Sequence, residues 1–193
     1  MACTKRGERE LNDTAVAAKF GNRRPLVTLQ GDPEQNPQNY DERNKLLEGV
    51  PLEPSQVPIY KKMKIVLTQN VRKDDDYVNG MECTVLEWQE NRQGGVLVVR
   101  TSTGKRLPIT RWTDTKKRLS YFPLRVGYAS TIHKAQGGEF KHVTIYMNAP
   151  YMPAAGYTAL SRVSTCGDYL LGGIIKRKHF VPATFTHPAQ YRG

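Results

Sequence analysis

The chain has 193 residues and a net charge of +11, and its 38% hydrophobic and 24% charged residues are typical of a globular protein. No stretch approaches the roughly 18 apolar residues that a transmembrane helix needs. The first ten residues, MACTKRGERE, are charged where a signal peptide is apolar, so we expect an intracellular protein with no membrane partner. The three cysteines are far apart and match neither a metal site nor a disulfide framework.

The positive charge is confined to the C-terminal two-thirds of the chain. Residues 1–60 carry a net charge of −1, and residues 61–193 carry +12. A basic surface attracts polyanions and gains affinity by releasing condensed counterions, which makes nucleic acid a natural partner. On charge alone, a basic protein without such a partner is the alternative.

In the N-terminal third of the chain, the sequence predicts few β-strands. Residues 1–20 predict a short strand and then a helix, whose apolar residues recur near the helical period and which ends at Gly21-Asn22. Residues 31–58 are rich in Gly, Asp, Pro, Asn and Gln, which predicts a long surface loop with little regular structure.

Short strands at close spacing dominate the middle of the chain. MKIVLTQNV predicts a strand, and Asn79-Gly80 predicts a tight turn because both residues tolerate positive φ. ECTVLEW, GGVLVVRT and KRLPITRW predict further strands, separated by glycine-containing turns. We therefore expect a small antiparallel β module, inserted at residues 78–121.

After Tyr121 the predicted strands and helices alternate. RVGYAS, HVTIYM and DYLLGGI predict strands, with TIHKAQG and PAAGYTALSRV as helices between them. This order implies a parallel sheet with helices on its faces. The predicted architecture is an α/β domain built from residues 1–77 and 122–175, with the insert at 78–121 and a flexible basic tail at 176–193.

The segment GYASTIHKAQGGEF has the features of an anion site. Thr131 is the predicted N-cap of a helix, where free backbone N–H groups and the helix dipole favour a phosphate. His133 and Lys134 lie in the same first turn, and Gln136 adds an amide. Taken singly, however, a His or Lys at a helix start is more often an ordinary surface residue.

Two further features suggest a nucleotide. Gly137-Gly138 allows close approach of a ligand, and Glu139 offers an acceptor suited to a ribose hydroxyl. In AAGYTALSRV, Arg162 ends a predicted helix, where a guanidinium can stabilise the charge that develops on a transferred phosphoryl group, as an arginine finger does. The alternative for Arg162 is a surface salt bridge.

Together, these two segments resemble motifs V and VI of superfamily 1B helicases. The Pif and RecD-like branch is the most similar, with the patterns Y-A-x-T-I-H-K-x-Q-G and Y-x-A-L-S-R. Upstream, MKIVLTQNVRKDDDYVNGMECTVLEW and ACTKRGERELND resemble further family segments, so the resemblance covers most of residues 2–174. One departure is Gly137-Gly138-Glu139, where the Pif branch more often has Gly, an apolar residue and Thr.

The resemblance implies a second RecA-like motor domain with a small inserted β-barrel. The residues that it assigns to single-stranded DNA or the ATP cleft are Thr131, His133, Lys134 and Gln136. Those that it assigns to the nucleotide are Gly138, Glu139 and Arg162, the last as the finger on the γ-phosphate. Asn79 and Gly80 would shape the entry to the inserted module, where family members hold or guide DNA.

A basic run within the insert is a second candidate for DNA. Residues 100–118 contain seven Lys or Arg and one acidic residue, Asp114. We predict that DNA phosphates are contacted by Lys105, Arg106, Lys116 and Lys117. The alternative is a charged face that serves solubility.

The sequence contains no phosphate-wrapping loop of the form G-x-x-x-x-G-K-[ST]. Gly104-Lys105 is followed by Arg106 and has Val99 where the first Gly should be. In the resembling family, the P-loop and the Mg²⁺ motif belong to the first motor domain. We therefore expect ATP and Mg²⁺ only in the complete motor, none bound tightly by this chain alone, and no ATP hydrolysis by it.

The expected partners are single-stranded DNA and a first motor domain that carries the P-loop, encoded upstream in the same gene or as a separate chain. Two alternatives stay open. One is a non-enzymatic helicase remnant that binds nucleic acid, and the other is a gene product without function.

Overall fold

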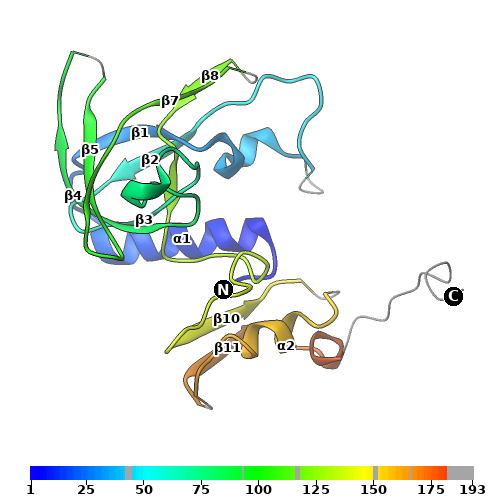
Figure 1. Cartoon of the computed structure of the whole chain (residues 1–193). Coiled ribbons are helices and arrows are strands. Elements are labelled where there is room, and N and C mark those ends of the chain that lie inside the picture. Colours follow the sequence, from blue (N-terminus) through cyan, green and yellow to red (C-terminus); the bar gives the residue numbers. More distant parts are fainter. Residues whose placement is uncertain (42–44, 93, 116–117, 150–151, 166, 182–193) are drawn as a thin grey trace, which may run out of the picture. The chain divides into compact units, whose positions relative to one another are not determined.

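The computed structural model describes residues 1–41, 45–92, 94–115, 118–149, 152–165 and 167–181 (Figure 1). The chain divides into two compact units, each described by itself below. The terminal unit comprises Met1–Glu8 and Ser130–Gly193, and the central unit comprises Arg9–Ala129. Helix α1 (Lys5–Phe20) begins in the terminal unit and continues into the central one.

The central unit is built on an antiparallel sheet of five strands in the order β6-β5-β4-β3-β9. Alternating apolar residues give these strands one buried face, typical of half-covered antiparallel strands. Two smaller antiparallel pairs, β1-β2 and β7-β8, complete the unit. The bounds are β1 Val27–Gly31, β2 Ser55–Ile59, β3 Lys64–Leu67, β4 Glu82–Gln89, β5 Val96–Thr101, β6 Arg106–Ile109, β7 Trp112–Asp114, β8 Leu119–Tyr121 and β9 Leu124–Val126.

One hydrophobic core lies within the central unit. Its members come from every part of the five-stranded sheet, from β1 and β2, and from the end of α1. They include the fully buried side chains of Ile59, Ile65, Leu97 and Phe122. Phe20 joins α1 to this core, which explains why the helix continues to that residue.

The terminal unit contains the parallel part of the fold. Strand β10 (Val143–Met147) pairs in parallel with β11 (Tyr169–Gly173), and Ala2 makes parallel bridges to Thr131 and Tyr146. Helix α2 (Ala155–Leu160) packs near β10, as Figure 1 shows. A second, smaller core of Met1, Cys3, Ile132, Ala135, Ile145, Met147, Ala155 and Ala159 fills this unit.

The fold is therefore mixed α/β. The predicted parallel sheet with helices on both faces is larger than the observed one, which consists of the β10-β11 pair and the bridges of Ala2. The segment RVGYAS was expected to extend a parallel sheet, whereas Val126 pairs antiparallel with Ile65 of β3. Strand β9 instead pairs with β3 and so joins the antiparallel sheet, and only β10, later in the chain, forms a parallel pair. Strands β6 and β9 occupy the two ends of the strand order, so the closed barrel stays a prediction.

The predicted domain division also stays a prediction. Strands β3 and β9 lie outside residues 78–121, yet they pair in the same sheet as β4, β5 and β6. In the predicted tail, the 3₁₀ helix Arg177–Phe180 buries His179, whose Nε2 lies 2.7 Å from the carbonyl oxygen of Ala149. Residues 182–193 lie outside the described residues.

Residues 31–58 are more ordered than predicted. They contain β2, which pairs with β1, and two 3₁₀ helices, Pro33–Gln35 and Pro37–Asn39. Buried side-chain amides replace regular backbone pairing here, because Asn39 Nδ2 donates to the carbonyl oxygens of Pro33 and Glu53, both at 2.8 Å. A third 3₁₀ helix, Lys73–Asp75, lies before β4. None of the described helices is long and apolar enough to cross a membrane.

Candidate functional site

Helix α1 fixes the backbone at the start of the motif V-like segment. Asn12 is buried, and its Oδ1 accepts hydrogen bonds from the N–H groups of Tyr128 at 3.0 Å and Ala129 at 2.8 Å. Its Nδ2 donates to the carbonyl oxygen of Ala129 at 3.2 Å. One side chain thus binds both polar groups of Ala129, two residues before Thr131.

Thr131 begins a compact turn within the terminal unit. Its side chain is buried, and Oγ1 accepts a hydrogen bond from the N–H of Lys134 at 3.3 Å, as predicted for a cap. The N–H of Ala135 donates to the Thr131 carbonyl oxygen at 3.1 Å. Residues 132–137, however, form successive turns and no α-helix, so the helix-dipole argument for an anion site was wrong.

Lys134 is paired within the protein. Its Nζ lies 3.1 Å from Oε2 and 3.3 Å from Oε1 of Glu8 on α1. The Glu8 side chain is 1% exposed, whereas the Lys134 side chain is 36% exposed. Sequence reasoning treated this ammonium as open to a phosphate, but a buried carboxylate already holds it. The Lys134 side chain nevertheless stays partly exposed.

The other predicted residues of this segment are mostly exposed. His133, Gln136 and Glu139 are accessible, and Gly137 has a φ of +84°, which favours glycine. A Cβ atom on Gly138 would lie 3.2 Å from the ring of Phe140, so this glycine allows the turn to pack closely. Polar side chains at this turn are therefore available to a ligand.

The two motif-like segments meet through the backbone. The N–H of Phe140 donates to the carbonyl oxygen of Arg162 at 2.8 Å, and Phe140 forms a parallel bridge with Val163. Glu139 therefore directly precedes a residue that is hydrogen-bonded to Arg162. The half-buried Arg162 side chain donates to Ser161 Oγ from Nη2 at 3.1 Å and from Nε at 3.3 Å.

The basic candidates of the central unit are largely paired. Lys105 Nζ lies 3.4 Å from Oδ2 of Asp76, and the Arg106 guanidinium pairs with Glu87. Hydrogen bonding from Thr103, followed by Lys105, holds the pKa of the Asp76 carboxyl below its usual value. These cations are exposed, but each already has a carboxylate partner.

The other four candidates of the insert have different outcomes. Asn79 is exposed in the predicted turn, and its N–H donates to Asn70 Oδ1 at 2.9 Å. Gly80 has a φ of +89°, as the Asn-Gly signal predicts. Lys116 and Lys117 lie outside the described residues.

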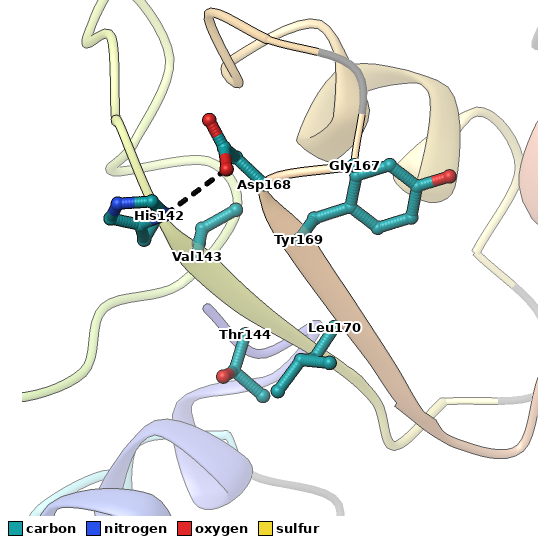
Figure 2. Close-up of a pocket in the computed structure, with 7 residues that line it drawn as sticks. All are labelled: His142, Val143, Thr144, Gly167, Asp168, Tyr169 and Leu170. Atoms are coloured by element: carbon teal, nitrogen blue, oxygen red, sulfur yellow. Dashed lines mark ion pairs between the residues drawn. The ribbon is translucent and has the colours of Figure 1, made fainter.

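A shallow pocket of about 290 Å³ lies at the start of the parallel strand pair. Figure 2 shows His142 and Asp168 facing one another across its rim, with His142 Nδ1 at 3.3 Å from Asp168 Oδ1. Thr144 and Leu170, which are paired in register on β10 and β11, line its floor. None of the predicted site residues that the structure describes lines this pocket.

The described residues contain no group of three or more His, Cys, Asp or Glu side chains able to hold a metal ion. Glu8 and Asn12 are positioning residues that the prediction of DNA and nucleotide contacts missed. They lie four apart on one face of α1, within the segment ACTKRGERELND that resembles the family, and these were the signals in the sequence.

Known proteins that resemble this chain match it over the two segments that meet at Phe140 and Arg162. The family model described as the UvrD-like helicase C-terminal domain matches residues 126–165, a range that contains both Thr131 and Arg162. A curated relative, the ATP-dependent DNA helicase Pif1 of Bdellovibrio bacteriovorus, is 28% identical over 105 residues. The chain resembles the C-terminal half of a superfamily 1B, Pif1-like helicase.

Solved Pif1 structures share the fold. Bacteroides Pif1 bound to single-stranded DNA has a TM-score of 0.67 at 20% identity, with 95% of this chain and 42% of that chain covered. Pif1 helicase from Candida albicans has a TM-score of 0.65 at 16% identity, with 94% and 46% covered. The Bdellovibrio match spans 50% of this chain and 23% of that relative. The Pif1-like chain therefore spans less than half of these proteins.

Proposed function

We propose that the chain is the C-terminal motor half of an ATP-dependent DNA helicase. It binds single-stranded DNA and supplies Arg162 as an arginine finger to an ATP site. The P-loop of that site belongs to a first motor domain, encoded upstream in the same gene or as a separate chain. The observation that carries this proposal is the backbone hydrogen bond between Phe140 and Arg162, which links the end of one motif-like segment to the other.

The residues near this hydrogen bond fit one wall of a nucleotide site. Arg162 is half-buried, and its guanidinium is held by Ser161, which limits its freedom before it meets a phosphate. Gly138 is half-buried, and Glu139 is exposed beside it. When bound, Mg²⁺-ATP supplies the phosphoryl group that is transferred to water, while Arg162 stabilises the negative charge that develops on it.

The turn that starts at Thr131 supplies the proposed DNA contact. Thr131 orients the backbone, while His133, Lys134 and Gln136 present polar groups at an accessible surface. Phosphate contacts of this kind bind without regard to sequence. Asn79, Lys105 and Arg106 of the central unit, with Lys116 and Lys117, form a second proposed contact.

The alternative function is a non-enzymatic helicase remnant that binds nucleic acid. The observation that favours it is the charge of +12 on residues 61–193, which serves DNA binding with or without a motor. The two proposals differ in Arg162, because a remnant has no use for an arginine finger.

Titration of single-stranded DNA at two salt concentrations tests the DNA contact. Lys134→Gln removes the ammonium, whereas Glu8→Gln breaks the same ion pair and leaves the ammonium in place. We expect Lys134→Gln to weaken binding and to flatten the salt slope by about 0.7, the share of one phosphate contact. Glu8→Gln should bind at least as well as the parent. Parent-like binding by Lys134→Gln would contradict the proposed contact.

A further inference from the structure

A second basic surface lies on the central unit, around three aromatic rings where α1 ends. Phe20 stacks on Tyr60, with ring centroids 4.6 Å apart and an interplanar angle of 6°. Lys19 Nζ lies 5.5 Å from the centroid of the Tyr128 ring, and the Tyr128 hydroxyl accepts a hydrogen bond from the Lys64 N–H at 3.1 Å. These contacts bring the end of α1, the turn after β2, and the start of β3 together.

Six exposed cations surround these rings, and we name the set the α1–β3 basic surface. Its members are Lys19, Arg23, Arg24, Lys61, Lys62 and Lys64. The two stretches of chain that supply them, residues 14–31 and 54–73, contain no Asp or Glu. In the part of the chain that the structure describes, none of the six forms an ion pair. The nearest acidic residue in the sheet register is Glu82, opposite Val66 on β4.

The backbone keeps these cations close to one another. The N–H of Arg23 donates to the carbonyl oxygen of Phe20 at 2.6 Å, which folds the chain back after α1. Lys62 has a φ of +67° in the tight turn that leads from Tyr60 to Met63, and its N–H donates to Val85 at 2.8 Å. Six like charges held on a fixed scaffold repel one another and create a positive potential that a polyanion relieves.

We propose that the α1–β3 basic surface is a further nucleic-acid contact, which binds the phosphate backbone independently of sequence. Phe20 covers one face of the Tyr60 ring, and Lys19 lies over the Tyr128 ring. Because these ring faces are already occupied, we expect the rings to hold the cations in place, and the stacking of bases on them to be secondary. The surface shares no residue with the turn at Thr131 or with the Lys105 and Arg106 group. It also stands apart from the proposed role of Arg162.

The free cations distinguish this surface from the chain's other basic groups. Lys105 and Arg106 are matched by Asp76 and Glu87, and Lys134 by Glu8. A phosphate that approaches those groups competes with a carboxylate, whereas one that approaches the α1–β3 basic surface releases counterions without that competition. The surface should therefore contribute more to the salt dependence of binding.

The test compares two triple variants of the full chain with equal loss of charge. The first is Arg24→Gln, Lys61→Gln and Lys62→Gln on the surface. The control is Lys45→Gln, Arg92→Gln and Arg177→Gln, which removes three exposed cations elsewhere. Binding to single-stranded DNA and to a duplex of the same sequence is measured by fluorescence anisotropy between 50 and 200 mM salt (about the range over which phosphate contacts are lost), with thermal melts as the folding control.

We expect the surface variant to bind DNA about tenfold more weakly at the low-salt end, and its salt slope to be shallower by about 2, the share of three phosphate contacts. The control variant should change the slope by less than half as much. Loss for both forms of DNA supports a contact with either backbone, and loss for one form identifies that form as the ligand. Equal effects of the two variants, or no loss on either DNA, would overturn the proposal.

Two further measurements distinguish this proposal from the proposed DNA contact at Thr131 and from membrane binding. Lys134→Gln tests the proposed function, so a loss in the surface variant with parent-like binding by Lys134→Gln refutes only the contact at Thr131. Vesicles with an anionic lipid serve as a second probe. If the surface variant loses vesicle binding and retains DNA binding, the surface serves membranes, and the nucleic-acid proposal is wrong.

Discussion

The terminal and central units use positive charge in different ways. In the terminal unit, Lys134 lies within a recognisable motif and is held by the buried carboxylate of Glu8. In the central unit, Lys61 and Lys62 belong to no motif, and in the described part of the chain they have no ion-pair partner. Lys134 thus has a structural role besides the binding role that we propose for it, whereas for Lys61 and Lys62 we propose a binding role alone. The following variants test this difference.

The largest effect is expected for Asn12→Ala. This buried amide makes three hydrogen bonds to Tyr128 and Ala129, and its loss leaves their backbone groups without those partners. We expect the free energy of unfolding to fall by about 3 kcal/mol, as for other buried polar groups left unsatisfied. Urea unfolding measures this loss, with the exposed Asn22→Ala as a control within about 0.5 kcal/mol. A parent-like midpoint for Asn12→Ala would contradict its positioning role.

Several features of the fold followed from local sequence. MKIVL has the β-branched pattern of a strand and forms β3, and Asn79-Gly80 forms the predicted turn. Thr131 Oγ1 accepts the predicted capping hydrogen bond from the Lys134 N–H, although turns follow it in place of the predicted helix. These features depend on residues within a few positions of one another, which is the range over which side-chain type governs backbone conformation.

The missed features depend on long-range contacts. Glu8 and Lys134 are 126 positions apart, so their ion pair could not be read from spacing. The antiparallel partner of β9 was mistaken because a strand's pattern does not state its direction of pairing. Asn36 and Asn39 made residues 31–58 look unstructured, although their amides hold that loop together. The prediction of Arg162 as an arginine finger came from the family resemblance and is still untested.

A smaller effect is expected for the pair Glu8 and Lys134. Lys134→Ala should lower the free energy of unfolding by about 1–2 kcal/mol, less than for a fully buried ion pair because its side chain is partly exposed. A double-mutant cycle with Glu8→Gln measures their coupling. Additive effects of the two changes would mean that the ion pair does not hold the turn.

The smallest effect is expected for Lys105→Gln combined with Arg106→Gln. Their exposed ion pairs with Asp76 and Glu87 should contribute less than about 1 kcal/mol to stability. Because each cation is already paired, we expect single-stranded DNA affinity to fall by only about twofold to threefold. Anisotropy titration beside the α1–β3 surface variant compares paired and unpaired cations directly. A larger loss of DNA affinity in Lys105→Gln with Arg106→Gln than in the α1–β3 surface variant would contradict the stronger role of unpaired cations.

The central claim is that this chain completes an ATP site, and ATP hydrolysis tests it most directly. The chain is joined to the P-loop-containing half of a Pif1 helicase, and turnover is measured with single-stranded DNA for the parent, Arg162→Ala and the control Arg177→Ala. We predict no turnover by the isolated chain, turnover by the joined halves, and a loss of about a thousandfold in Arg162→Ala alone. Hydrolysis by the isolated chain, no turnover by the joined halves, or an undiminished rate in Arg162→Ala, would contradict the account.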